Sequence, residues 1–316
     1  MKRRAVLVAT TASVLPLRGR GKERKKIGRI GFLPAAKDSP AFNALSDGLK
    51  DIGYVDGDNL VLESRDSGTR LEHLTELAAE LLALPVDIIV TQGPYGLEAA
   101  KKATKTVPIV FAGVGANFPG LTDQENLTGV AEEIVASTVK RLALLKESVP
   151  SRQRIGIFAN PNNYGTQAYM RNCEDWGRSN GVMLHVYNVS DPNDFLPAFD
   201  RMVADKMEGV LAFTDSIIFR QRKLIVKTAL KYKLPGAYPY HEWVEAGGLL
   251  SYGPNLNLTL RQQIPPMIDK ILKGARPREI EVEQPQSSIF VNLTSAKAMG
   301  IALPKSVLDR ASEELS

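Results

Sequence analysis

The sequence predicts an α/β protein with two Rossmann-like lobes, each built on a parallel sheet, and a hinged cleft between them. From residue 27 onward, short apolar segments alternate with amphipathic helical segments, which is typical of βαβ units and a parallel sheet. The alternation loosens at 113–129 and then restarts, which indicates a second series of the same kind. A chain of 316 residues is long enough to bury a core in each lobe.

The first series predicts four strands connected by helices. The strand segments are RIGFLP at 29–34, NLVLES at 59–64, VDIIVTQ at 86–92 and VPIVFAG at 107–113. Runs of Ile and Val like these are typical of strands that helices cover on both faces. Ser39 and Pro40 predict the start of the first helix, because Ser is a favoured N-cap and Pro fits the first helical position.

The second series repeats the pattern over 134–274. Its expected strands are RIGIFAN at 154–160, VMLHVYNV at 182–189, GVLAFTD at 209–215, LPGAYPY at 234–240 and GGLLSYG at 247–253. Its expected helices lie at about 134–147, around Cys173, near 194–205, at 217–232 and at 260–274. Pro265 and Pro266 predict that the last of these helices is kinked or restarted, since proline supplies no backbone donor.

The formal net charge of +5 originates in the first 26 residues. They contain nine Lys or Arg residues and one Glu, whereas the other 290 residues contain 31 basic and 34 acidic residues. Nucleic-acid-binding proteins usually carry their basic excess on the folded domain. The sequence therefore predicts no nucleic-acid partner.

The segment 1–26 has the layout of a secretory signal. A basic start precedes an apolar stretch at 5–17, and the apolar region of such signals spans about 7–15 residues. No clear small-x-small cleavage site follows, so a simple tail or a misassigned start codon remains the alternative. No apolar run approaches the roughly 20 residues that span a bilayer. We expect a periplasmic or otherwise extracytoplasmic protein.

Motifs for catalysis and cofactors are absent. The single cysteine, Cys173, excludes an internal disulfide, and the three histidines have no spacing typical of zinc. The sequence contains no phosphate-binding loop, dinucleotide fingerprint or nucleophile elbow. We therefore expect no metal, no cofactor and no enzymatic activity.

One stretch resembles a hydrolase signature. His241, Glu242 and Glu245 read His-Glu-x-x-Glu, whereas a zinc protease helix needs a second His where Glu245 stands. The less favoured alternative is an α/β hydrolase that uses His241, Glu242 and Asp215. It requires these side chains to come within about 2.6–3.2 Å of each other or of the substrate.

Candidate ligand-binding residues lie where strands give way to helices. These positions meet at one edge of each sheet, and helix N-termini attract anions. Asp215 is a candidate partner for an ammonium group, and three tyrosines are candidates for stacking on a planar solute. Each residue alone is also explained as a cap or as packing. The candidates are Ser39, Thr91, Gly93, Tyr95, Asn117, Asn160, Tyr164, Asp215, Tyr238 and His241.

Several blocks resemble solute-binding proteins of bacterial ABC uptake systems, in the branch that includes aromatic amino-acid binders. They are LSDGLKDIGYVDGDNLVLESR, LTELAAELLALPVDIIVTQG, AAKKATKTVPIVFAG, VEAGGLLSYGPN, IDKILKGARPREIEVEQP and VNLTSAKAMGIALPKSVLDRA. The resemblance implies a type I periplasmic-binding fold with three crossing segments. It also implies a non-enzymatic, monomeric receptor that closes on a small-molecule solute and delivers it to an ABC permease and ATPase. The implied division is a leader at 1–26, a first lobe at 27–133 plus 254–278 and a second lobe at 134–253 plus 279–316.

The chain departs from the family pattern beside the expected cleft. Relatives commonly have Asp-Pro after the fourth strand and then Pro-Gly-Gly-Asn-x-Thr-Gly, whereas this chain has Gly-Ala-Asn at 115–117 and keeps only Asn-Leu-Thr-Gly at 126–129. Ligand identity is therefore not carried over, and a sensory ligand domain for a signalling partner is the alternative function. A transcriptional repressor is disfavoured, because 26 residues leave no room for a helix-turn-helix headpiece.

Overall fold

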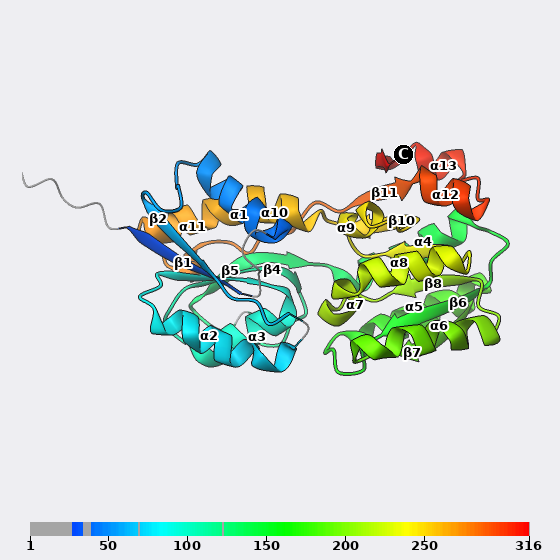
Figure 1. Ribbon diagram of the computed structural model, residues 1–316, viewed down its shortest axis with the longest axis horizontal. Helices are drawn as coiled ribbons and strands as arrows, with labels where there is room; N and C mark the ends of the chain where they lie inside the picture. Colours follow the sequence, from blue (N-terminus) through cyan, green and yellow to red (C-terminus); the bar gives the residue numbers. More distant parts are fainter. Residues whose placement is uncertain (1–26, 34–38, 69, 122, 316) are drawn as a thin grey trace, which may run out of the picture.

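The computed structural model describes residues 27–33, 39–68, 70–121 and 123–315, so the expected secretory signal lies outside the described residues. The molecule has two α/β lobes side by side along its long axis (Figure 1). This confirms the predicted fold class. Within the described ranges, every helix is too short or too polar to cross a lipid bilayer.

The first lobe contains a five-stranded parallel sheet in the order β2-β1-β3-β4-β5. Its strands are β1 (Gly28–Leu33), β2 (Leu60–Ser64), β3 (Ile88–Gln92), β4 (Ile109–Gly115) and β5 (Leu127–Glu132). Its helices are α1 (Pro40–Asp51), α2 (Leu74–Ala83), α3 (Gly93–Ala103), α10 (Leu256–Gln262) and α11 (Ile264–Leu272), with short 3₁₀ turns η1 (Leu71–His73) and η3 (Pro277–Glu279). One face of the sheet packs on α1, α10 and α11, and the other packs on α2 and α3.

The second lobe contains a seven-stranded sheet in the order β12-β11-β10-β9-β8-β6-β7, in which only the β10–β11 pair is antiparallel. Its strands are β6 (Arg154–Ala159), β7 (Met183–Asn188), β8 (Gly209–Ala212), β9 (Gly236–Tyr238), β10 (Leu250–Gly253), β11 (Ser288–Asn292) and β12 (Ala311–Leu315). Its helices are α4 (Ile134–Ser148), α5 (Thr166–Asn180), α6 (Phe195–Ala204), α7 (Ser216–Arg220), α8 (Arg222–Lys231), α9 (His241–Glu245), α12 (Leu293–Met299) and α13 (Lys305–Leu308), with the 3₁₀ turn η2 (Pro192–Asp194).

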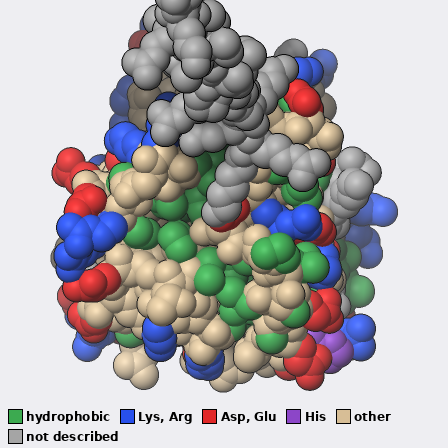
Figure 2. Space-filling view, turned by 90° about the vertical axis from the view of Figure 1, so that its left-hand side faces the viewer, with side chains coloured by type: hydrophobic (Ala, Val, Ile, Leu, Met, Phe, Trp, Pro, Cys, Tyr) green, Lys and Arg blue, Asp and Glu red, His purple; other side chains and the backbone are tan. Residues whose placement is uncertain are grey.

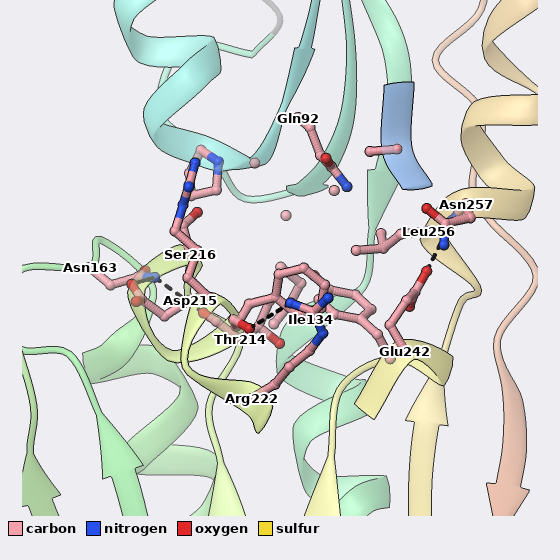
Figure 3. A pocket seen from close by; sticks show the side chains of 18 of the residues that line it. Gln92, Ile134, Asn163, Thr214, Asp215, Ser216, Arg222, Glu242, Leu256 and Asn257 are labelled. Carbon is pink, nitrogen blue, oxygen red and sulfur yellow. Dashed lines mark hydrogen bonds between the residues drawn. The ribbon is translucent and has the colours of Figure 1, made fainter. Parts of the chain in front are cut away.

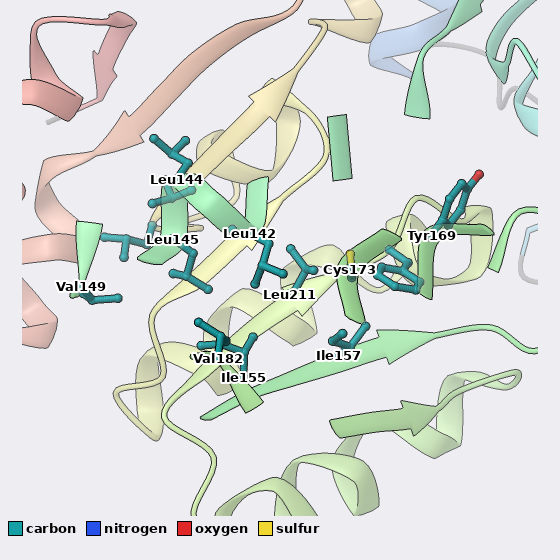
Figure 4. Packing of buried hydrophobic residues seen from close by; sticks show 14 of the residues in the cluster. Leu142, Leu144, Leu145, Val149, Ile155, Ile157, Tyr169, Cys173, Val182 and Leu211 are labelled. Carbon is teal, nitrogen blue, oxygen red and sulfur yellow. The ribbon is translucent and has the colours of Figure 1, made fainter. Parts of the chain in front are cut away.

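The core of the second lobe consists of two clusters of buried residues, and β6 contributes to both. Leu142 and Leu145 of α4 pack on Ile155, Ile157 and neighbouring residues (Figure 4). The lone cysteine of α5 belongs to this cluster and is fully buried. Its position fits the ordinary behaviour of a buried cysteine as a small apolar side chain.

Local sequence signals determine where the helices begin and break. The Ser39 side chain caps α1 by accepting a hydrogen bond from the Phe42 amide at 3.2 Å, with Pro40 in the first helical turn. The predicted break before Pro265 is confirmed, because α10 ends at Gln262 and α11 begins at Ile264. The helix expected at 217–232 is instead two helices, which are separated at Gln221.

The chain passes between the lobes three times (Figure 1). The first passage leads from β5 to α4, and the second leads from β10 to α10. The third lies between Glu283, which pairs with Val130 of the first sheet, and Ser288, where β11 begins. The sequence predicts that the chain enters the second lobe between residues 278 and 279, which lie inside η3 and before Glu283. The exact boundaries of the lobes stay a prediction.

The end face of the first lobe carries mixed charges. Figure 2 shows Lys and Arg side chains interleaved with Asp and Glu side chains, and hydrophobic side chains gathered between them. On this face the visible basic side chains do not merge into one continuous patch. Such an arrangement lacks the basic stripe that marks many nucleic-acid-binding surfaces.

Candidate ligand-binding cavity between the lobes

A cavity of about 230 Å³ lies between the lobes (Figure 3). The first lobe contributes the starts of α1 and α3, the end of β4 and the start of α10 to its wall. The second lobe contributes residues around α7, α8 and α9. The carboxyl ends of parallel strands face this space from both sides, where open α/β sheets bind their ligands.

Six of the ten predicted ligand-binding residues lie at this cavity or contact a residue that lines it. Ser39, Gly93, Tyr164 and Asp215 line the cavity. Tyr95 and Asn160 both contact the Asp215 carboxylate. Whether they bind a solute stays a prediction.

The other four predicted residues do not line the cavity. Thr91 is completely buried inside β3, and Asn117 is exposed in the turn after β4. Tyr238 faces the core of the second lobe and stacks on Trp243, with ring centroids 4.6 Å apart. The side chain at the end of β9 points inward, so Tyr238 is not available to stack on a solute in this cavity.

His241 connects α9 to the C-terminal strand. Its Nε2 lies 3.1 Å from Glu313 Oε2 of β12, and its Nδ1 lies 3.2 Å from Asn255 Nδ2. The ring also packs edge-on against Phe290. His241 therefore shares no hydrogen bond with Glu242 or Asp215, and the constellation that the hydrolase alternative requires is not formed.

Asp215 is surrounded by hydrogen-bond donors. Its Oδ1 accepts from the amides of Ile217 and Ile218 at the start of α7. Its Oδ2 accepts from Asn160 Nδ2 at 3.1 Å, Asn163 Nδ2 at 2.9 Å and the Tyr95 hydroxyl at 3.4 Å. An ionised carboxylate offers about four lone-pair sites, so these five donors saturate it. Because Tyr95 belongs to α3, this cluster also connects the two lobes.

A second connection between the lobes is ionic. Arg220 Nη2 of α7 lies 3.2 Å from Asp66 Oδ1 of the first lobe, and both side chains line the cavity. Together with the Tyr95–Asp215 contact, this ion pair joins the two lobes beside the cavity. The structure therefore has its lobes in contact over the cavity.

A second cavity of about 410 Å³ adjoins the first and shares Tyr164 with it. Three lysines line it, but their ammonium groups already have partners. Lys101 donates to two backbone carbonyl oxygens, Lys102 pairs with Glu98, and Lys105 donates to a carbonyl oxygen of α3. Their charges are directed at the protein rather than at the space.

Comparison with protein families gives a match to the model for "ABC transporter substrate binding protein" over residues 36–315. The chain belongs to this family. The match covers nearly all of both lobes, in agreement with the resemblance of the sequence blocks.

Known relatives share the length and the fold of this substrate binding protein. The "Tyrosine-binding protein" of Clostridioides difficile (strain R20291) is 22% identical over 289 residues, which cover 88% of this chain and 81% of that protein. A conserved domain protein from Vibrio cholerae O1 biovar El Tor has a TM-score of 0.81 and 24% identity, with 92% of this chain and 100% of that chain covered. An ABC domain from Streptococcus pneumoniae in complex with L-Trp has a TM-score of 0.80 and 21% identity, with 91% and 99% covered.

Four charged residues that were not predicted as ligand-binding residues line the cavity: Asp66 and Arg220, which pair with each other, and Arg222 and Glu242. Arg222 begins α8, and Glu242 lies at the start of α9, next to the passage from β10 to α10. Glu242 was considered only as an acid or a metal ligand, whereas Arg222 lies in a charged helical stretch without a motif. One signal did point to Glu242, because it follows β9 at the carboxyl edge of the sheet.

A further buried acid contacts the cavity wall through Tyr240. Glu132 ends β5 at the first passage between the lobes, is 7% exposed and leaves Oε1 without a hydrogen-bond partner. Burial raises the pKa of Glu132 to about 8, and the positive charge of the buried Arg141 only partly opposes this. Arg141 instead donates to Thr138, Thr214 and the Tyr252 carbonyl oxygen.

Proposed function

We propose that this chain is the extracytoplasmic solute-binding component of an ABC-type uptake system. It captures an amino-acid-like solute between its lobes and delivers it to a permease and its ATPase. The observation that carries the proposal is the cavity between the lobes, which combines charged groups of both signs with an aromatic wall. Solute capture in such a cleft requires only binding and closure.

The size of the cavity favours a small solute. Its volume of about 230 Å³ lies below the roughly 300–1,000 Å³ of pockets for drug-sized ligands. The rings of Tyr164, Tyr169, Phe219 and Tyr240 lie in its wall, and Arg222 and Glu242 supply the charges. An amino acid with an apolar or aromatic side chain combines these properties in one small molecule.

The relatives support the same class of solute. One is named for tyrosine binding, and the pneumococcal structure contains L-Trp. The basic start and apolar stretch of residues 1–26 support export to the compartment in which such receptors meet their solutes.

The test is solute binding by the full chain, purified without refolding. Native mass spectrometry is expected to detect a co-purifying metabolite, and a thermal-shift panel of the twenty amino acids identifies the class. A solute at a hundred times its Kd stabilises the folded state by about 2.7 kcal/mol, which raises the unfolding temperature measurably. Neutral solutes of similar size, myo-inositol and D-fucose, serve as controls. A shift with these sugars and with no amino acid contradicts the proposal.

A further inference from the structure

Glu242 has a buried carboxylate oxygen with no partner in the protein. The residue is 5% exposed and lines the cavity. Its Oε1 accepts a hydrogen bond from the backbone N–H of Asn257 at 3.0 Å, whereas Oε2 has no hydrogen-bond partner (Figure 3). A buried carboxylate oxygen without a donor is unfavourable, so this position favours a ligand that supplies one.

Asp215 is the other carboxylate of the second lobe in this wall, and it has no comparable capacity. Both of its oxygens already accept hydrogen bonds from protein donors. An ammonium group at Asp215 would have to displace donors that also join the lobes. Glu242 accepts an additional donor without any such loss.

Arg222 provides the opposite charge in the same cavity. Its guanidinium group stacks on the Phe219 ring, 4.5 Å from the centroid, and Nη1 donates to the Phe219 carbonyl oxygen at 3.2 Å. These contacts fix the orientation of the planar group. Among the described residues, Arg222 makes no ion pair, so its remaining N–H groups are available to an anion. A fixed guanidinium fork is well suited to a carboxylate.

We infer that Glu242 and Arg222 are the two charge receptors of the cavity, with Glu242 Oε2 accepting from the ammonium group of a solute and Arg222 donating to its carboxylate. This inference rests on the proposed function and specifies its chemistry. Asp215, which the sequence suggested for the ammonium group, instead holds the cavity wall and the contact between the lobes.

Binding of an ammonium group at this position is expected to change the pKa of Glu242. Burial raises the pKa of Glu242, and its neighbours only partly compensate for it. The titratable groups that face Glu242 are His241 and Glu245 of α9, Tyr240 before it, Arg222 of α8 and Glu132 of β5. A solute ammonium group beside Glu242 is expected to lower this pKa, because a positive charge favours the ionised carboxylate.

Calorimetric titration with matched probes tests the inference. The probes are L-tryptophan, tryptamine, which lacks the carboxylate, and indole-3-propionate, which lacks the amine; L-tyrosine, tyramine and 3-(4-hydroxyphenyl)propionate form a second set. The parent protein is expected to bind at least one amino acid about 10- to 100-fold more tightly than either of its analogues, because each lost charge-assisted hydrogen bond removes that much affinity.

Two variants test which side chain binds the ammonium group of the solute and which binds its carboxylate. Glu242→Gln is expected to bind the amino acid and its deaminated analogue equally. Arg222→Gln is expected to lose the discrimination against the decarboxylated amine. Glu245→Gln is the control, since it removes a half-exposed carboxylate from the same helix without touching the cavity.

The outcomes separate the inference from the function on which it rests. If the parent protein binds an amino acid and Glu242→Gln keeps the preference for the amine, the inference is wrong and the proposed function stands. If the parent protein binds none of these probes and none of the twenty amino acids, both are wrong. If Glu242 had only a structural role, its replacement would weaken the binding of all probes by the same factor. The selectivity between probes therefore distinguishes a structural role from a binding role.

Discussion

Replacing Glu132 by Gln should change how the stability of this protein depends on pH. Glu132 lies at the first passage between the lobes, where its carboxyl group is buried and makes no ion pair among the described residues. Gln keeps the size and the hydrogen-bonding shape of the side chain but does not titrate. The variant therefore removes one ionisation and leaves the packing nearly unchanged.

The magnitude follows from the pKa of Glu132, which burial raises from 4.5 to about 8. A raised pKa in an acid means that the folded state holds the proton over a range in which the unfolded chain has lost it. Stability from this group is complete below pH 4.5 and is lost as the pH rises towards 8. The loss is about 1.3 kcal/mol per pH unit in that window, or about 2.5 kcal/mol between pH 5 and pH 7.

Urea unfolding of the full chain at pH 5, 6 and 7 measures this loss. The free energy of unfolding of Glu132→Gln relative to the parent protein is expected to increase by about 2.5 kcal/mol across the series, with an unchanged slope against urea. Glu133→Gln removes the exposed neighbouring carboxylate and is the control. A difference between Glu132→Gln and the parent protein that stays constant with pH would refute the reasoning.

Two further predictions concern closure and packing. Asp66→Asn removes the ion pair with Arg220 and is expected to weaken solute binding about two- to fivefold, because a partly exposed pair contributes up to about 1 kcal/mol. Calorimetry checks this, and an unchanged Kd at low salt contradicts it. Gly253→Ala places a Cβ 1.8 Å from the Pro239 carbonyl oxygen and is expected to destabilise the second lobe by more than about 2 kcal/mol. Gly181→Ala, which meets no atom within 4 Å but needs a positive φ, is expected to cost only about 1 kcal/mol in thermal unfolding and serves as the comparison.

The sequence predicts the alternating elements because their signals are local. Ser39 and Pro40 determine the start of α1, and Pro265 separates two helices, through backbone chemistry that depends on adjacent residues only. Elements that depend on distant partners carry no such signal. The first three residues of β5 end the stretch at 113–129 in which the sequence shows no clear pattern, yet β5 pairs with β4 at the edge of the first sheet.

The candidate site also has some features that the sequence predicts and others that depend on distant parts of the chain. The sequence predicts which residues follow the carboxyl ends of strands. Ser39, Gly93 and Asp215 were chosen on this basis, and all three line the cavity. The direction in which a side chain points cannot be predicted in this way. Tyr238, for example, was expected to face a solute but stacks on Trp243 in the core. Whether a carboxylate can accept a further hydrogen bond depends on how many protein donors surround it. Those donors come from several elements, so the sequence does not predict it.

The His-Glu-x-x-Glu stretch illustrates why residue type and spacing alone do not assign a role to a side chain. On α9 its three side chains have different surroundings: His241 contacts the C-terminal strand, Glu245 lies 3.6 Å from that imidazole at the surface, and Glu242 lines the cavity. A metal site needs such groups to converge, whereas here one turn of helix distributes them. Glu242 accepts from the backbone of α10 in the first lobe, and its charge raises the pKa of Glu132 at another passage between the lobes. A solute cation at Glu242 is therefore expected to lower the pKa of Glu132 as well, because it offsets the negative charge that raises it.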